Sequence, residues 1–383
     1  MSHAYKGFEP NWVRGEFPKD SYRSIFKWGD LLEIKPPRES LYRMMKAKFG
    51  LTDDDFKSYT EDIGFDKVEF NLPIQLKERD LEAFRAIMGS EFVRTDDYAR
   101  LSVAYGKTMY DILRLRNKIV ENVPDAVLYP DTKEQIEQVV AYCAKHKIPV
   151  YVYGGGSSVT RGVECVKGGI SLDMRLRFNK VIEFNEIDQT ITVEAGMSGP
   201  KLEETLNNAV KLFGAKRAYT CGHFPQSFEY SSVGGWVVTR GAGQNSTYYG
   251  CISDIVLAQE YATPIGVLKT DRYPRKATGS DLGQILMGGE GTYGVLTHVT
   301  LKVFRHMPET IKRFSYMFKD WETAQAAARE IMQSEAGYPS VFRLSDPEET
   351  SVMLHLYGVM DSPLKHLFRS EERRVGKECR SRW

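Results

Sequence analysis

The chain has 383 residues, of which 42% are hydrophobic, and its 52 basic residues nearly balance its 51 acidic ones. This length allows a large core in two or three domains, and the even charge gives no overall field that would attract nucleic acid or an anionic membrane. The five cysteines lack CxxC spacing and histidine partners, so we expect no metal site and a reducing compartment. No apolar run is long enough to cross a bilayer, and we expect the protein to be cytoplasmic.

Residues 1–122 are polar at first and then helical in pattern. Short amphipathic helices are expected over Glu39–Phe49 and Leu81–Met88, and a longer helix over Leu101–Arg116. Gly106 interrupts the middle of that longer pattern. The apolar residues expected to share one face of the longer helix are Val103, Met109, Ile112 and Leu113. We predict an N-terminal, mostly helical region.

From residue 123 the pattern alternates between strands and helices. DAVLYP is typical of a short buried strand, Asp131 and Thr132 can cap a helix that runs to about Lys147, and Val150–Tyr153 is the next strand. GISLDM, KVIEF and TITVEAG continue as strands, the last two joined in a hairpin, and Ser198 can cap a helix over KLEETLNNAV. Residues 123–306 are therefore expected to form one mixed domain of an α+β protein.

The strand VYVY stops on three glycines, Gly154–Gly156, which are followed by Ser157 and Ser158. Glycine adopts backbone conformations closed to other residues, and successive exposed N–H groups of such a loop can bind phosphate oxygens. A tight turn explains a lone glycine cluster equally well. No helix follows the loop, no acidic residue stands where the dinucleotide pattern requires it, and Gly-Lys-Ser/Thr is absent, which disfavours the two common phosphate-binding folds.

Three further glycine-rich stretches follow. GHFPQSFEYSSVGGWVVTRGAG (222–243) contains a strand-like WVVTR, YATPIGVL (261–268) is typical of a hairpin, and MGGEGTYGVLTHVTLKVF (287–304) leads from a glycine loop into an alternating strand. Turns alone are a poor explanation for several such loops in one domain. A long ligand with a pyrophosphate and polar ring edges would use them together, bound largely by backbone N–H groups.

The ordered set of PVYVYGGGSSV, ISLD, VEAG, GHFPQSFEYSSVGGWVVTRGAG, ATPIG and GGEGTYGVLT resembles the FAD-linked oxidases of the vanillyl-alcohol-oxidase type, also called PCMH-type. Within that superfamily the chain is similar to the alkyldihydroxyacetonephosphate synthases and their bacterial relatives. The resemblance covers about Tyr98 to Leu344. It implies a two-lobed FAD-binding domain at 123–306, preceded by the helical region and followed by a separate cap domain.

The resemblance also implies which residues contact FAD. Val152–Ser158 matches the loop for the pyrophosphate, while Gln226–Ser232, Val238–Gly241 and Glu290–Leu296 match three further flavin contacts. The cofactor-binding residues predicted in this way are Val152, Tyr153, Gly154, Gly155, Gly156, Ser157, Ser158, Gln226, Ser227, Ser231, Ser232, Val238, Thr239, Arg240, Gly241, Glu290, Gly291, Thr292, Gly294 and Val295.

Two departures from the family pattern bear on the flavin. Gln226 stands where the family usually has aspartate, which would alter a hydrogen bond near the flavin. Relatives that bind FAD covalently have a histidine after the glycine loop, whereas Ser157 and Ser158 stand there in this chain, and this predicts noncovalent FAD. His223 is left unassigned, because a lone histidine beside glycines is more often structural.

Residues 307–368 are expected to begin the cap, a ferredoxin-like α/β domain. IKRFSYMF, a helix over Trp321–Met332 and PSVFRLSD follow a β-α-β order. Arg343 lies in the last of these segments and matches an arginine that the family requires for activity, although a surface arginine on a strand is the ordinary interpretation.

The resemblance implies one of two activities. The first is exchange of the acyl group of acyl-dihydroxyacetone phosphate for a fatty alcohol, which forms an ether lipid. The second is dehydrogenation of a 2-hydroxy acid such as D-lactate, and a third interpretation is a fragment that binds FAD without turnover. The expected partners are a small-molecule or lipid substrate, a membrane surface reached through that lipid, and a second copy in a homodimer, but no nucleic acid.

The last residues, 369–383, form the charge-dense string RSEERRVGKECRSRW, which has no apolar period. The string resembles the translation of a sequencing adapter, and a solvated basic tail is the alternative. We expect it to be an artefact and the natural chain to continue after Phe368 with the family's catalytic tyrosine and histidine-rich loop.

Overall fold

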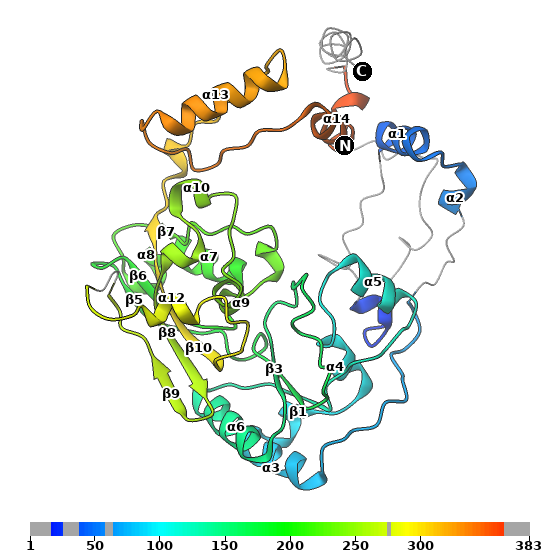
Figure 1. Ribbon diagram of the computed structural model, residues 1–383, viewed down its shortest axis with the longest axis vertical. Coiled ribbons are helices and arrows are strands. Elements are labelled where there is room, and N and C mark those ends of the chain that lie inside the picture. The colour runs from blue at the N-terminus through cyan, green and yellow to red at the C-terminus, as the bar shows by residue number, and fades with distance from the viewer. Residues whose placement is uncertain (1–16, 26–37, 58–63, 274–276, 364–383) are drawn as a thin grey trace. The chain divides into compact units, whose positions relative to one another are not determined.

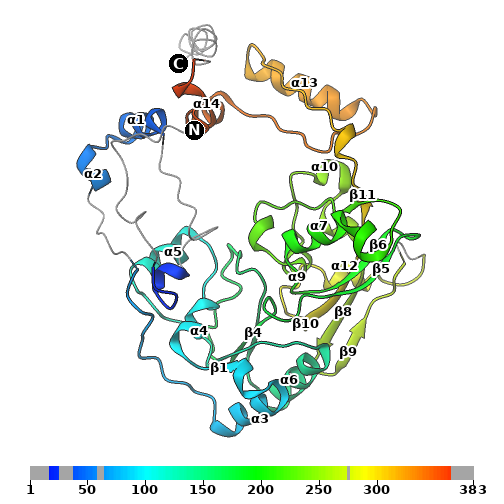
Figure 2. The ribbon, with the colours of Figure 1, turned by 180° about the vertical axis from the view of Figure 1, so that it is seen from behind.

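The computed structural model describes residues 17–25, 38–57, 64–273 and 277–363 (Figures 1 and 2). In this described part the chain forms two compact units. The larger unit holds residues 18–25, 64–273 and 277–311, and the smaller one holds residues 17, 38–57 and 312–363. Each unit has its own packing and is described by itself.

The first lobe of the larger unit is built on a four-stranded sheet in the order β1-β2-β4-β3. Strands β2, β4 and β3 are parallel, and β1 pairs antiparallel with β2. Two helices, α3 and α6, pack with this sheet around one hydrophobic core. The bounds are β1 Val93–Arg94, β2 Ala126–Leu128, β3 Val150–Tyr153, β4 Ile170–Asp173, α3 Glu78–Met88 and α6 Lys133–His146.

Local sequence explains why α6 begins where it does. Thr132 accepts a hydrogen bond from the N–H of Gln135, whose side chain bonds back to the N–H of Thr132 in a capping box. The predicted apolar face of α6 is completely covered, since Ile136, Val139 and Cys143 are buried. The predicted helix and its burial are therefore confirmed.

The second lobe is a five-stranded antiparallel sheet in the order β5-β6-β10-β8-β9. Both predicted hairpins are confirmed, because β5 pairs with β6 and β8 pairs with β9 through the turn between Thr263 and Gly266. The bounds are β5 Val181–Asn185, β6 Thr190–Glu194, β8 Val256–Thr263, β9 Gly266–Lys269, β10 Val295–Lys302, α7 Gly199–Asn207, α8 Ala209–Phe213, α9 Val233–Val238, α10 Ser246–Tyr249, α11 Ile252–Ile255 and α12 Leu282–Leu286.

Several short elements complete the larger unit. A two-stranded sheet joins β7 to β11, and helices α4 and α5 lie between β1 and β2 in the chain. The bounds are β7 Tyr219–Thr220, β11 Phe304–Arg305, α4 Asp97–Ser102, α5 Met109–Arg116, and the 3₁₀ turns Tyr22–Ser24, Ser90–Phe92, Phe228–Tyr230 and Pro308–Thr310.

The smaller unit is helical in its described residues. Ser40 at the start of α1 donates from its N–H and its hydroxyl to the carboxylate of Asp361, at 3.1 and 2.8 Å, and so joins α1 to the 3₁₀ turn near residue 360. The bounds are α1 Glu39–Phe49, α2 Asp53–Lys57, α13 Trp321–Gln333, α14 Pro347–Leu356 and the 3₁₀ turn Val359–Asp361. None of the described helices is long and apolar enough to span a membrane.

Two predicted helices are each divided into two. The pattern over Leu101–Arg116 forms α4 and α5 with a break around Gly106, so that Met109 and Leu113 are exposed rather than on a shared apolar face with Val103. The helix after Ser198 ends at Asn207, and the break leaves Val210 exposed. At Gly106 the close approach of the backbone to the carbonyl of Ser158 overrides the local period.

The segment WVVTR is not a strand, since Val233–Val238 forms helix α9. Ser232 caps this helix, and Gly234 approaches Ala195 so closely that a side chain at Gly234 would lie 2.7 Å from the Ala195 methyl group. The strand preference of valine and tryptophan is overridden by this packing. Strand β10 is present as predicted, but it is buried on both faces and does not alternate in burial.

The helix predicted over Trp321–Met332 is confirmed as α13, but the two flanking segments are not strands in the described residues. Their large apolar side chains, including Phe314, Tyr316 and Val341, are exposed. A strand needs a neighbour to accept its hydrogen bonds, and the smaller unit offers none in its described part. Residues 369–383 lie outside the described residues.

Candidate flavin site

The glycine loop follows β3 at the carboxyl edge of the parallel strands β2, β4 and β3. Its close contacts explain the glycines. A Cβ added to Gly155 would lie 1.9 Å from the carbonyl oxygen of Tyr230, and one added to Gly154 would lie 2.4 Å from the hydroxyl of Ser232. Gly156 has a positive φ of 65°, which favours glycine. The loop therefore packs directly on the second predicted flavin segment.

The backbone N–H groups of this loop are the clearest chemical feature of the site. In the described part of the chain, none of the N–H groups from Gly154 to Ser158 donates a hydrogen bond, although Gly156 is buried. Buried backbone donors are nearly always satisfied, so the free N–H of the buried Gly156 indicates a ligand at this loop. Successive free N–H groups bind anionic oxygens, and the loop fits the pyrophosphate of FAD.

The second segment is held by its own hydroxyl groups. The hydroxyl of Ser231 accepts a 2.6 Å hydrogen bond from the indole N–H of Trp236, and that of Ser232 accepts the N–H of Gly235 at 3.2 Å. Both serines are buried. Each hydroxyl keeps one O–H donor, while its acceptor role fixes the start of α9, where Ser232 lies against Gly154. The segment begins at Gln226, which is exposed, and Ser227.

The third and fourth segments bind to each other. The N–H of Glu290 donates to the carbonyl of Val238 at 3.1 Å, and the guanidinium of Arg240 donates to the carbonyl oxygens of Gln284 at 2.7 Å and Met287 at 3.1 Å. Thr239 beside Arg240 is exposed. Arg240 is thus a structural tie in this arrangement, and its side chain points to protein carbonyls.

The fourth segment also reaches the glycine loop. A Cβ added to Gly162 would lie 3.0 Å from the carboxylate of Glu290, so the far side of the loop and the fourth segment are neighbours. Gly291, Thr292 and Gly294 follow in an exposed to half-buried turn, and Val295 begins β10 with its side chain in the core of the first lobe. The structure therefore brings together all four segments predicted to contact FAD.

Comparison with known proteins agrees with this geometry. The family profile described as "FAD binding domain" matches residues 124–271. Residues 124–271 therefore match a family of FAD-binding domains. It is 30% identical to an alkyldihydroxyacetonephosphate synthase of Dictyostelium discoideum, over 88% of this chain and 58% of that protein.

A solved structure of an alkyldihydroxyacetonephosphate synthase superimposes with a TM-score of 0.71 at 28% identity, over 80% of this chain and 55% of the other. A mitochondrial cytochrome-dependent D-lactate dehydrogenase of Arabidopsis thaliana is 32% identical over 48% of this chain and 30% of that protein. The chain spans about half the length of the curated synthases that it matches. The flavin domain and the two-lobed α+β fold are confirmed.

Sequence reasoning missed a charged pair beside the glycine loop of this flavin domain. Arg175 lies over the ring of Tyr153, 4.6 Å from its centroid, and binds the carboxylate of Asp173 through two hydrogen bonds of 3.0 and 2.6 Å. Asp173 is the last residue of the ISLD motif and pairs in register with Tyr153. That motif was the only signal available, and it did not single out Arg175.

His223 lies inside the second lobe. It is buried, packs edge-on against Trp236, and neither ring nitrogen has a hydrogen-bond partner among the described residues. Burial lowers the pKa of His223 to about 4, so the ring is neutral at neutral pH. Gly241 is its neighbour, since a Cβ there would lie 3.6 Å from Nε2.

Arg343 belongs to the smaller unit and not to the unit that holds the flavin loops. It is half exposed and forms an ion pair with Glu349 at the start of α14. Its catalytic role stays a prediction.

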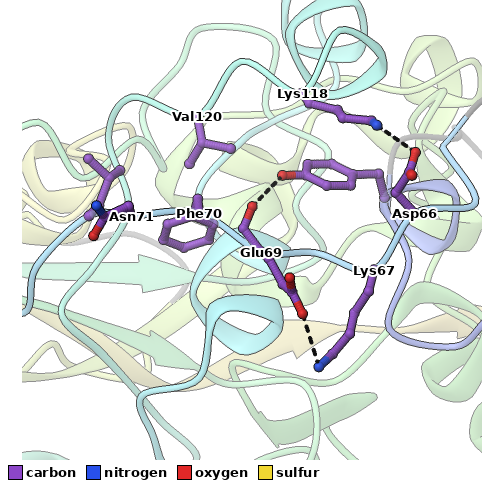
Figure 3. A pocket seen from close by; sticks show the side chains of 9 residues that line it. Asp66, Lys67, Glu69, Phe70, Asn71, Lys118 and Val120 are labelled. Carbon is purple, nitrogen blue, oxygen red and sulfur yellow. Dashed lines mark hydrogen bonds and ion pairs between the residues drawn. The ribbon is translucent and has the colours of Figure 1, made fainter.

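A cavity in the described residues lies elsewhere in the larger unit (Figure 3). It has a volume of about 430 Å³ and is open to solvent. Its walls carry the ion pairs Lys118–Asp66 and Lys67–Glu69, with the Tyr22 hydroxyl bound to the carbonyl of Glu69. None of the predicted flavin residues lines this cavity, so the flavin assignment rests on the loops and their free N–H groups.

Proposed function

We propose that the protein binds FAD noncovalently and exchanges the acyl group of an acyl-dihydroxyacetone phosphate for a fatty alcohol. The observation that supports this reaction is the extent of the similarity. The match to the synthase covers 88% of the chain and must extend well beyond residues 123–306, whereas the D-lactate dehydrogenase match covers 48%. The segments outside the flavin domain, which include the predicted cap, thus resemble the synthase.

The residues of the glycine loop would hold the cofactor through its pyrophosphate. The free N–H groups of Gly154–Ser158 are the donors, and the Ser157 and Ser158 side chains offer hydroxyl groups where covalent relatives have histidine. When bound, FAD supplies the reactive N5 position against which such enzymes place a substrate. The chain's own part is to fix the cofactor and to keep its anionic end out of water.

The first experiment tests the cofactor. Purified protein should show flavin absorbance, and after acid precipitation the yellow colour should be in the supernatant, where chromatography should identify FAD. Colour that stays in the pellet would show a covalent bond. Protein that takes up no flavin would overturn the whole proposal.

The second experiment tests the reaction. The FAD-loaded protein is incubated with palmitoyl-dihydroxyacetone phosphate and hexadecanol, and mass spectrometry should detect the alkyl ether together with released palmitate. The same protein is assayed with D-lactate and an artificial electron acceptor. Reduction of that acceptor without ether formation would favour the 2-hydroxy acid dehydrogenase, and flavin without either turnover would favour a protein that only binds FAD.

The remaining expectations belong to the same proposal. A lipid substrate suggests contact with a membrane surface, and we infer a cytoplasmic homodimer as the working form. The balanced charge of the chain supports neither nucleic acid binding nor general attraction to anionic lipid. Gel filtration and sedimentation with vesicles of neutral phospholipid test these points.

A further inference from the structure

The glycine loop is fixed by a segment that lies outside the matched flavin domain. That domain begins at residue 124, but the backbone N–H of Lys107 donates to the carbonyl of Ser158 at 2.8 Å. Gly106 permits the approach, because a Cβ there would lie 2.3 Å from the same oxygen. The last residue of the row of free N–H groups is therefore held by the N-terminal region.

The same segment holds the loop a second time, six residues further on. The buried guanidinium of Arg114 in α5 binds the buried carboxylates of Asp111 and Glu164, each at 2.9 Å. Glu164 ends the stretch that continues from the glycine loop, and it also accepts from Asn122 at 2.8 Å and from Arg161. The ring of Tyr105 covers Arg114, 4.0 Å from the guanidinium carbon.

Burial and hydrogen bonding act in opposite directions on the pKa of Glu164. Burial alone would raise the pKa of Glu164, but the hydrogen bonds from Arg114, Asn122 and Arg161 outweigh it and lower the pKa to about 2. A buried ion pair of this kind adds little net stability over apolar residues of the same size, because both ions lose their hydration. The ion pair instead fixes the position of the stretch that contains Glu164 relative to α5, which contains Arg114.

We propose that residues 105–116 are a functional part of the flavin site, and that Arg114 is a positioning residue that keeps the glycine loop in its anion-binding conformation. Between Tyr153 and Glu164 the chain has no helix or strand of its own, so its shape depends on these two attachments. A loop set before the ligand arrives avoids the entropy cost of ordering it during binding. The inference rests on FAD binding and is independent of which reaction follows.

The test compares Arg114→Met with Arg100→Met. Arg100 is an equally buried arginine of the same region, bound to the carbonyl oxygens of Pro124 at 2.8 Å and Leu72 at 3.1 Å, and it does not touch the loop. The measurements are the Kd for FAD, from quenching of flavin fluorescence, and the melting temperature of each apoprotein. Binding is measured well below the lowest melting temperature.

We expect both variants to lower the melting temperature, but only Arg114→Met to weaken FAD binding, by about tenfold or more, which is typical when a partner that orients a binding group is removed. Trypsin should also cut the apo form of Arg114→Met faster after Arg161, which is exposed within the loop. Equal FAD affinity in Arg114→Met and Arg100→Met would overturn the inference.

Glu164→Gln keeps the test informative if Arg114→Met fails to fold. Glutamine has nearly the same shape as glutamate but lacks the charge that pairs with Arg114. This variant should weaken FAD binding to a similar extent, and Arg114→Lys should restore part of the affinity. A wild-type protein without FAD binding would refute the proposed function, whereas tight FAD binding in wild type and in Glu164→Gln alike would refute only the role of residues 105–116.

Discussion

The first and third flavin segments differ in where their hydrogen bonds go. In Gly154–Ser158 the N–H groups have no acceptor among the described residues. In Val238–Gly241 the carbonyl of Val238 accepts the N–H of Glu290 in the fourth segment, and Arg240 binds the carbonyls of Gln284 and Met287 just before that segment. The first segment is thus prepared for a ligand, and the third is held by the protein itself.

The largest expected effect comes from filling the glycine loop. In Gly155→Ala the new methyl group would lie 1.9 Å from the Tyr230 carbonyl oxygen, so either the loop or the second segment must move. Overpacking of this kind costs about 1–3 kcal/mol, and we expect it to appear as loss of FAD affinity, because the displaced N–H groups are those that would bind the pyrophosphate. Fluorescence titration with FAD measures it.

Gly241→Ala is the matched control in the third segment. Its Cβ would meet His223 and Trp236 at 3.6 Å, an ordinary contact distance. FAD affinity should then stay within about twofold of wild type, because a small substitution without a steric clash changes the free energy by less than about 0.5 kcal/mol. Equal loss of flavin in both variants would show that the two segments do not differ in the way described.

The next effect concerns pH. His223 has a pKa of about 4 in the folded protein, below the 6.5 of a free histidine, so the unfolded chain binds its proton first as the pH falls. Stability is therefore complete above about pH 6.5 and is lost progressively toward pH 4, by roughly 2 kcal/mol at pH 5. Urea unfolding of the apoprotein at pH 7.5 and pH 5 should show this loss.

In His223→Leu most of that pH dependence should disappear. A smaller part should remain, because burial also lowers the pKa of His298. His306→Gln, at an exposed histidine after β11, should retain the wild-type behaviour. An unchanged difference between the two pH values in His223→Leu would mean that His223 is not the buried neutral group that the structure shows.

A third prediction tests the tie between the third and fourth segments. Arg240→Met removes the hydrogen bonds to Gln284 and Met287, and because Arg240 is exposed the loss in unfolding free energy should be about 1 kcal/mol. FAD affinity should fall less than in Gly155→Ala. Arg217→Met, at an exposed arginine outside the site, is the control. A large loss of FAD affinity without a change in melting temperature would make Arg240 a direct flavin ligand.

Local chemistry made much of this fold predictable. Thr132 and Gln135 begin α6, and the turns at Asn185–Gln189 and Pro264–Gly266 set the two hairpins, because each signal acts over a few residues. The four flavin segments were identified through the resemblance to the FAD-linked oxidases. What failed was decided by distant contacts, as when the packing of Gly234 on Ala195 made WVVTR a helix.

The missing parts of the site have the same cause. Arg175 follows one parallel strand and lies over the ring of Tyr153, which ends the neighbouring strand. Arg114 binds Glu164, which is 50 residues away in sequence. The sequence around an arginine does not tell whether its guanidinium binds a distant carboxylate or faces solvent. Side-chain pairing across elements therefore had to come from the structure.

The smallest expected effect lies in the other unit, at Arg343. Its ion pair with Glu349 is exposed, so Arg343→Met should change the unfolding free energy by less than about 0.5 kcal/mol and leave the Kd for FAD unchanged. If Arg343 is catalytic, as the family resemblance implies, turnover should be lost in Arg343→Met and retained in Glu349→Gln, which breaks the same ion pair from the other side. Equal turnover in both variants and wild type would contradict the catalytic prediction, and a change in FAD affinity would mean that the smaller unit also acts on the flavin loops.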